Sequence, residues 1–541
     1  MSWESTNSIR AGTRRWFTPT RVGALLIIAG LIWRTARYLA AWPIWGDEAF
    51  VAVDFLTRDY ADMLKPSQYG QIVPLLFMWG ELAICRAFGS SEQALRLLPF
   101  VAGVLSLLLY WRLARTTLAP RTALLPIGFF AAAYFTVRHG AEVKPYASDL
   151  LISLIFLLLA LRIRSKSGDW PAWAALIALA GLGGWASYPA IFCAGGIAIY
   201  LALLVWRSRF SAAMAIPWVI YCVALLGGFM VLYITYARPQ ADFAAKIITT
   251  EMWSPTFPPW KQPWMVPVWL VGMHTGLMMA YPYGGQTPGS VATTILAILG
   301  AIRLWRKQRD LLLLLLAPLM PTLLAASLKS YPYGGSARTS LYMAPAFCLL
   351  AGLGLHVVLQ QVAKRMQSPP SRSEWLRRME LGVSTALALF AVGLSVSDMI
   401  APYKSGPVKA SHDAARAIAA RVRPGDAWVM FNAIERVPYA PYLGDWRGAG
   451  GQFVFDALRF SPVKPAWAPR PATVECPPNG RVWLIAYRIF KVEFPEEQWQ
   501  AYRDAIQARC GTPAFERFEI KRDKDSDKVE SVDVYRFGPA D

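Results

Sequence analysis

Long apolar segments alternate with short polar connections over the first 400 residues of the chain. Eleven of these segments are long enough to cross a bilayer, which takes roughly twenty residues of helix. They lie at 22–41, 96–112, 122–138, 146–162, 171–188, 189–206, 212–236, 288–303, 311–328, 338–361 and 380–400. This pattern predicts a mainly α-helical, polytopic membrane protein whose transmembrane module covers residues 1–400.

Two further apolar stretches, 70–88 and 264–280, are harder to place. The short basic connections all fall on one side of the membrane only if neither stretch crosses it. We therefore predict that both stretches are helices lying in the opposite interface, where tryptophans such as Trp79 and Trp264 are common. The basic side is then cytoplasmic and carries the N-terminus, while the first loop, 42–95, faces outside.

Residues 401–541 have a different character, with alternating strand-like runs and a polar helical run. These runs predict a small α/β domain on the outer, periplasmic side of the membrane. Its two cysteines, Cys476 and Cys510, could form one disulfide if that side is oxidising. The predicted elements lie at 427–431, 481–487, 496–509 and 532–537.

The composition agrees with a membrane protein, because 55% of the residues are hydrophobic and only 17% are charged. The formal net charge of +20 can indicate nucleic-acid binding, contact with anionic lipids or the positive-inside rule. The C-terminal domain holds about 21 basic and 18 acidic residues, so the excess charge belongs to the membrane module. The charge is therefore mainly a signal of topology, and we expect contacts with membrane lipids and none with nucleic acid.

Candidate chemistry begins directly after the first segment, where Asp47 and Glu48 stand next to each other between interfacial tryptophans. The plain interpretation is a helix start, with the acidic pair favouring the first turn. The alternative is a catalytic carboxylate pair. Lys144 and Arg338 fall on the predicted outer side, against the positive-inside bias, and could bind a phosphate there.

Aromatic and acid–base groups gather on the same predicted side. The pentapeptide Tyr-Pro-Tyr-Gly-Gly occurs at 281–285 and again at 331–335, either as two interfacial turns or as two loops lining one site. Tyrosines there could hydrogen-bond a phosphate or stack on a sugar, although interfacial tyrosines are commoner. His139 beside Glu142 could be an acid–base pair, although a satisfied interfacial histidine is commoner. We expect Arg34 and Arg37 to pair with an acidic group of the first loop.

Four stretches, in this order, resemble motifs of the GT-C glycosyltransferases, particularly the branch of dolichyl-phosphate-mannose protein mannosyltransferases and aminoarabinose lipid A transferases. They are Asp47-Glu48, Ser91-Glu-Gln-Ala-Leu-Arg-Leu-Leu-Pro99, Glu142-Val-Lys-Pro-Tyr146 and Arg338-Thr-Ser-Leu-Tyr-Met-Ala-Pro345. Three departures stand out: Lys144 replaces the usual arginine, Gln71-Ile-Val-Pro74 replaces a lysine before a proline pair, and the aromatic residue after Arg338 falls at Tyr342 instead of the next position. The resemblance therefore implies the superfamily and leaves the substrate open.

The resemblance implies an inverting transferase of the bacterial inner membrane, which moves a sugar from a polyprenyl-phosphate (undecaprenyl-phosphate) carrier to a lipid, glycan or protein acceptor. Asp47 would take the proton of the acceptor hydroxyl, while Glu48 would orient the acceptor or a loop. Lys144 and Arg338 would neutralise the leaving phosphate. The residues Tyr146, Tyr331 and Tyr333 would assist at the phosphate, and Glu142, His139 and Gln71 would contact the acceptor or a loop.

No cofactor is required by this chemistry, but a divalent cation held by Asp47, Glu48 and Asp54 stays an open alternative. Two other function classes also stay open. A transporter or flippase of lipid-linked glycans predicts charged residues in the middle of helices and discontinuous helices in two halves. A scaffold whose outer domain recruits partners would need far fewer crossings than this chain has.

Overall fold

The computed structural model describes most of the membrane module and parts of the C-terminal domain. The described residues of the module are 18–42, 44, 46–67, 70–247, 250–282, 289–366 and 369–400. Those of the C-terminal domain are 413, 417, 420, 421, 423, 426–431, 476, 478, 480–488, 496–522 and 529–538. The side chain of Asp47, the predicted helix start near 410 and most of the first Tyr-Pro-Tyr-Gly-Gly copy lie outside this part.

Nine helical segments in the described ranges are long and apolar enough to cross a membrane. They are α2 (Pro19–Leu39), α6 (Leu97–Thr117), α9 (Tyr146–Ser165), α11 (Pro189–Arg207), α12 (Ala212–Leu232) with η3 (Tyr233–Ala237) and α13 (Arg238–Ile247), α15 (Gly289–Lys307), α16 (Arg309–Leu316) with α17 (Leu319–Ser327), η7 (Leu341–Met343) with α18 (Ala344–Met366), and α19 (Pro369–Ile400). The prediction of a mainly helical membrane protein is confirmed.

The predicted count of eleven crossings is not confirmed. The segment 122–138 forms two short helices, α7 (Leu124–Ala131) and α8 (Tyr134–Arg138). The break arises because Ala133 is extended and the Tyr134 N–H donates to the carbonyl of Pro282, a long-range partner. The helix α10 (Trp170–Ala186), with 17 residues, is apolar but shorter than the nine long segments.

The two stretches predicted to lie in the interface form short helices, which do not count among the nine long apolar segments. The first is part of the loop after α2, which folds as α3 (Gly46–Thr57), η1 (Asp62–Leu64), α4 (Leu75–Phe88) and α5 (Glu92–Leu95). The second folds as η5 (Pro263–Met265), α14 (Val266–Thr275) and η6 (Leu277–Met279), after the short helix η4 (Thr250–Thr256). A last short helix, η2 (His139–Ala141), follows α8.

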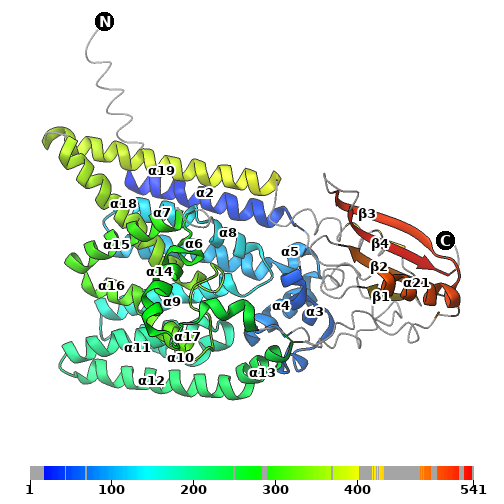
Figure 1. The fold of residues 1–541 in the computed structure, drawn as a ribbon. Helices are drawn as coiled ribbons and strands as arrows, with labels where there is room; N and C mark the ends of the chain where they lie inside the picture. The colour runs from blue at the N-terminus through cyan, green and yellow to red at the C-terminus, as the bar shows by residue number, and fades with distance from the viewer. Residues whose placement is uncertain are drawn as a thin grey trace, which may run out of the picture.

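Two close helix pairs, α15 with α18 and α2 with α19, help to fix the arrangement of the helices in the bundle. The helices α15 and α18 approach so closely that a Cβ at Gly354 would lie 1.8 Å from the Leu296 carbonyl oxygen, and one at Gly300 would lie 2.0 Å from that of Leu350. The helix α19 runs alongside α2, while α3, α4, α5 and α13 gather at one end of the bundle (Figure 1).

The partners predicted for the two arginines of α2 were wrong. Arg37 forms a buried ion pair with Asp398 of α19, and Arg34 donates to Thr136 Oγ1 at 2.7 Å and to backbone carbonyls. Neither partner belongs to the first loop. The reason is tertiary: α19 packs along α2 and brings its own carboxylate to the buried face.

The C-terminal domain contains a four-stranded sheet of order β1-β2-β4-β3, with β1 and β2 parallel and the other pairs antiparallel. Its elements are β1 (Ala427–Phe431), β2 (Val482–Arg488), α21 (Glu496–Cys510), β3 (Ala514–Arg522) and β4 (Val529–Phe537). The small α/β domain is confirmed, and Cys476 and Cys510 form a disulfide. The boundary at 400–401 stays a prediction, because α19 ends at Ile400 and the next residues are not described.

Candidate active site

The first turn of α3 carries the acidic pair. The backbone of Asp47 lies in this turn, and its role stays a prediction because its side chain is not described. Glu48 is 1% exposed and accepts hydrogen bonds from Arg96 Nε at 2.9 Å and Arg96 Nη2 at 2.7 Å. The Val143 N–H donates to the same carboxylate at 2.8 Å. Glu48 therefore joins three segments: α3, the start of α6 and the connection before α9.

The segment Glu142-Val143-Lys144 is held at each residue by a different part of the chain. Glu142 accepts from Arg138 Nε at 2.7 Å and lies 2.7 Å from His139 Nδ1. Val143 is bonded to Glu48, as described above. Lys144, which is 6% exposed, donates through Nζ to Gln71 Oε1 at 2.7 Å. Four predicted site residues, 48, 71, 142 and 144, thus meet around one short segment.

The position of Gln71 is set by a buried amide from α13, which lies at the same end of the bundle (Figure 1). Gln240 of α13 accepts from the Val73 N–H at 3.1 Å and donates to the Val73 carbonyl at 3.2 Å. The Tyr188 hydroxyl donates to the same amide oxygen at 3.1 Å. Both backbone groups of Val73 are hydrogen-bonded to Gln240, so the segment that carries Gln71 is held in place beside Lys144.

The second predicted cation, Arg338, lies over the ring of Trp253, with its guanidinium carbon 5.5 Å from the ring centroid. Its positive charge helps to lower the pKa of His139, so the two side chains share one electrostatic environment. Tyr146 presents an edge contact to the His139 ring at 5.2 Å between centroids. The structure thus connects Arg338, His139 and Tyr146 to the segment that carries Lys144.

The remaining tyrosines have partners of their own. The Tyr331 hydroxyl donates to the Thr339 carbonyl at 2.9 Å, and the Tyr333 hydroxyl lies 3.0 Å from His274 Nε2. Burial raises the pKa of Tyr333 to about 12, so its hydroxyl keeps its proton at neutral pH. A role of either tyrosine at a phosphate stays a prediction.

The protonation of the His139–Glu142 pair follows from its surroundings. Burial raises the pKa of Glu142, but the charges and hydrogen bonds of His139 and Arg138 outweigh it, and the pKa lies well below its usual range. Burial lowers the pKa of His139, and Arg138 and Arg338 lower it further against the opposing effect of Glu142. Near neutral pH the pair is therefore an ionised carboxylate beside a neutral imidazole.

Sequence reasoning missed several residues that organise this region. Arg96 and Arg138 also lie on the predicted outer side, so the charge argument that selected Lys144 would have selected them too. Asp149, in the first turn of α9, is buried, and its Oδ1 has no hydrogen-bond partner among the described residues. Its charge helps to raise the pKa of Tyr331, after the larger effect of burial, which places it near that ring. Gln240 carried no signal in the sequence.

The described donors do not fit a metal ion. Both carboxylate oxygens of Glu48 are bonded to Arg96, and Asp54 Oδ1 is bonded to Arg58 at 3.1 Å. Within the described ranges, no group of three or more His, Cys, Asp and Glu side chains could hold a metal. Because the Asp47 side chain is outside those ranges, the divalent cation stays a prediction.

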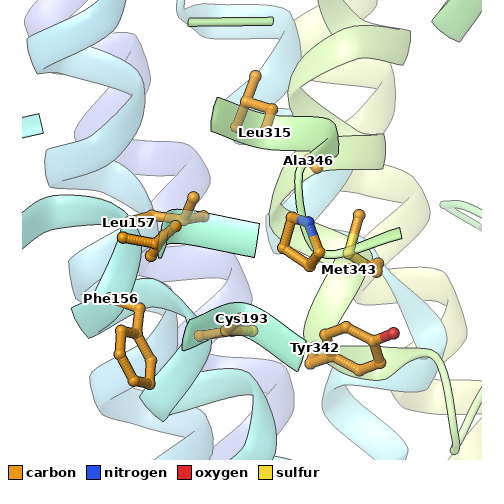
Figure 2. A pocket seen from close by; sticks show the side chains of 10 residues that line it. Phe156, Leu157, Cys193, Leu315, Tyr342, Met343 and Ala346 are labelled. Atoms are coloured by element: carbon orange, nitrogen blue, oxygen red, sulfur yellow. The ribbon is translucent and has the colours of Figure 1, made fainter. Parts of the chain in front are cut away.

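A small apolar pocket lies between α9, α11, α16 and the start of α18 (Figure 2). The Tyr342 hydroxyl, 2.5 Å from Thr322 Oγ1, belongs to one of its few polar side chains. These walls suit a hydrocarbon group better than a phosphate or a sugar. The lining residues labelled in Figure 2 are Phe156, Leu157, Cys193, Leu315, Tyr342, Met343 and Ala346.

Residues 72–234 match the family model described as dolichyl-phosphate-mannose-protein mannosyltransferase. Two solved structures share the fold over almost the whole chain. ArnT from Cupriavidus metallidurans in the apo state is 12% identical with a TM-score of 0.55, covering 96% of this chain and 99% of that chain. ArnT from Cupriavidus metallidurans bound to undecaprenyl phosphate is 14% identical with a TM-score of 0.57 and the same coverage of 96% and 99%. No curated protein sequence matches the chain significantly.

Proposed function

We propose that the chain is a membrane glycosyltransferase of the GT-C superfamily. In this proposal it transfers one sugar from a polyprenyl-phosphate carrier, such as undecaprenyl phosphate, to an acceptor on the periplasmic face of a bacterial inner membrane. The acceptor is a lipid, a glycan or a protein. The N-terminus is cytoplasmic in this proposal, and the C-terminal domain is periplasmic, as the basic connections indicate.

One observation carries the proposal: Glu48, the neighbour of Asp47, is bonded to the N–H of Val143, the neighbour of Lys144. A direct hydrogen bond therefore joins the segment of the predicted base to the segment of the predicted phosphate-binding cation, which supports a common site. The Glu48–Arg96 pair holds this arrangement in a buried environment, where the geometry of charged groups is well defined.

The chemistry follows from this juxtaposition. Asp47 accepts the proton of the acceptor hydroxyl, and the hydroxyl oxygen attacks the anomeric carbon of the sugar. The bond from that carbon to the phosphate oxygen breaks, and its electron pair stays on the phosphate. Attack opposite the leaving group inverts the configuration at the sugar carbon. Lys144 and Arg338 stabilise the negative charge that develops on the leaving phosphate.

The surroundings support a lipid-linked donor. The cationic side chains of Lys144 and Arg338 suit the phosphate of such a donor. The shared fold with a structure that holds undecaprenyl phosphate supports the same class of carrier. The replacement of the family's arginine by Lys144 and the sequence Gln71-Ile-Val-Pro74 leave the sugar and the acceptor open.

The test is Asp47→Asn in the purified full-length chain. Loss of the base should lower the rate of sugar transfer by about 10²–10⁴-fold, while the affinity for polyprenyl phosphate stays within about twofold. Asp59→Asn is the matched control, because Asp59 is an exposed carboxylate of the same loop, paired with Arg86 at the surface. An Asp47→Asn enzyme with full activity would refute the proposal, and so would a wild-type chain that binds no polyprenyl phosphate.

A further inference from the structure

His139 and Glu142 form a carboxylate–histidine pair in which Nε2 of the histidine has no hydrogen-bond partner among the described residues. His139 is 2% exposed, and its Nδ1 lies 2.7 Å from Glu142 Oε2. An ionised carboxylate can only accept, so Nδ1 carries the proton and Nε2 holds a lone pair. Nε2 is buried and has no hydrogen-bond partner among the described residues.

The ring cannot turn to find another partner. It stacks on Phe135 at 5.9 Å between centroids, with an angle of 10° between the planes, and Tyr146 closes its edge at 5.2 Å. Glu142 is itself held by Arg138 Nε at 2.7 Å. A fixed, buried nitrogen without a partner is unfavourable in a folded protein and calls for an explanation. A ligand atom that completes the hydrogen bond supplies one.

The charges around the ring favour an anion. Arg138 and Arg338 both act on His139, and Lys144 follows Glu142 by two residues in a segment held against Gln71. Glu142 is the one carboxylate among the charged groups that act on His139. The two arginines and one carboxylate leave a positive surplus of one charge beside a neutral imidazole. An incoming anion reduces this repulsion and stabilises the imidazolium form.

We propose that His139 Nε2 binds the phosphate of the lipid carrier, and that the ring takes up one proton from solvent as the phosphate arrives. This inference rests on the proposed function. The proton from solvent forms one N–H bond at Nε2, and no other covalent bond changes in the binding step. Nε2–H then donates to a phosphate oxygen, while Nδ1–H keeps its hydrogen bond to Glu142. During transfer, the imidazolium stabilises the second negative charge that the phosphate gains when its bond to the sugar breaks.

The ligand-free protein is prepared for this step, because burial and the nearby arginines lower the pKa of His139 and keep the ring neutral. The bound phosphate opposes these effects, so proton uptake accompanies binding. Carrier affinity should consequently rise as the pH falls toward 6, the region in which histidine commonly titrates.

The experiment is isothermal titration calorimetry of the full-length chain in detergent with a polyprenyl phosphate. Titrations in two buffers of different ionisation enthalpy at pH 7 measure the protons taken up for each phosphate bound. We compare the wild type with His139→Gln, which cannot titrate, and His139→Asn, which keeps a donor near Glu142 but lacks Nε2. His356→Gln is the matched control, because His356 also pairs with a buried glutamate, Glu380, in a different part of the bundle.

Both His139 variants should take up about one proton fewer per phosphate than the wild type, and His139→Asn should bind about tenfold more weakly. His356→Gln should match the wild type in both quantities. Ionisation of the phosphate itself contributes equally to all four proteins and cancels in the comparison. Unchanged proton uptake in either folded His139 variant would overturn this inference while leaving the proposed function intact. A wild type that fails to bind the phosphate would instead refute the proposed function.

Discussion

Two buried histidine–glutamate pairs stand in different parts of the molecule. His139 lies 2.7 Å from Glu142 and His356 lies 2.6 Å from Glu380, in each case through Nδ1. The pairs differ at the other ring nitrogen. His356 Nε2 lies 2.9 Å from the amide nitrogen of Gln360, whereas His139 Nε2 has no hydrogen-bond partner among the described residues.

The surroundings explain the difference. The His356–Glu380 pair joins α18 to α19, and the second ring nitrogen of His356 is engaged by Gln360, one turn along α18. The His139–Glu142 pair belongs to a connection held by Glu48 and Gln71 from the first loop. A histidine whose Nε2 has a partner within the bundle fits a structural role, and a fixed histidine whose Nε2 has none among the described residues fits a ligand. The following predictions test this contrast.

The largest effect is expected from Glu48→Met. This variant removes the carboxylate that is hydrogen-bonded to Val143, in the connection that carries the His139–Glu142 pair. The variant leaves Arg96 buried without its partner, which should cost about 3–5 kcal/mol of stability. Misplacement of Lys144 and His139 should lower the transfer rate more than about 10²-fold. Thermal unfolding and initial transfer rates measure the two effects.

The double variant Glu48→Met/Arg96→Met separates stability from position. It should recover much of the lost stability, because an apolar pair can replace a buried ion pair. It should not recover activity, because the Val143 N–H still lacks its acceptor. Recovery of both properties would mean that Glu48 serves stability alone.

A smaller effect is expected when the two pairs are broken in the same way. Glu142→Gln removes the charge that orients His139 and should lower the transfer rate about 10–100-fold. Glu380→Gln makes the same chemical change between α18 and α19. It should keep the transfer rate within about twofold of the wild type, even if it lowers the unfolding temperature as much as Glu142→Gln does. Equal losses of rate in the two variants at equal stability would contradict the contrast.

The smallest effect concerns the dependence of stability on pH in the ligand-free protein. Because the pKa of His139 is lowered in the folded state, the unfolded chain binds more protons than the folded chain between that pKa and the usual value of 6.5. Stability is therefore lost as the pH falls below about 7, by up to about 1.4 kcal/mol per pH unit. His139→Gln should flatten this slope in unfolding curves recorded between pH 5.5 and 7.5, and an unchanged slope would show that His139 does not titrate as described.

Much of the fold could be predicted from the sequence because apolar length and charge distribution are local signals. The strands at 427–431 and 482–488 and the helix at 496–510 were located within one residue at each end, and the short helices of the first loop also formed. The strand β3 was missed because its side chains are largely exposed and half of its residues are charged or polar. The broken helix at 122–138 could not be predicted, because its break depends on a bond to Pro282.

The sequence alone could select candidate residues but not the contacts between them. The charge argument placed Lys144 and Arg338 on one side, and the resemblance favoured a catalytic role for Asp47. The pairing of Glu48 with Arg96 joins residues 48 positions apart, and no periodicity in the sequence encodes it. Gln240 acts across 167 residues through the backbone of Val73, a contact that any residue type except proline would allow at position 73. Such contacts follow from packing alone.

The central claim is that the carrier phosphate is bound beside the Glu142–Lys144 segment, and its most direct test is an experimental structure of the full-length chain with a bound polyprenyl phosphate. The account predicts a phosphate in contact with Lys144, Arg338 and Nε2 of His139, and close to the carboxylate of Asp47. A phosphate bound away from all four of these residues would contradict it.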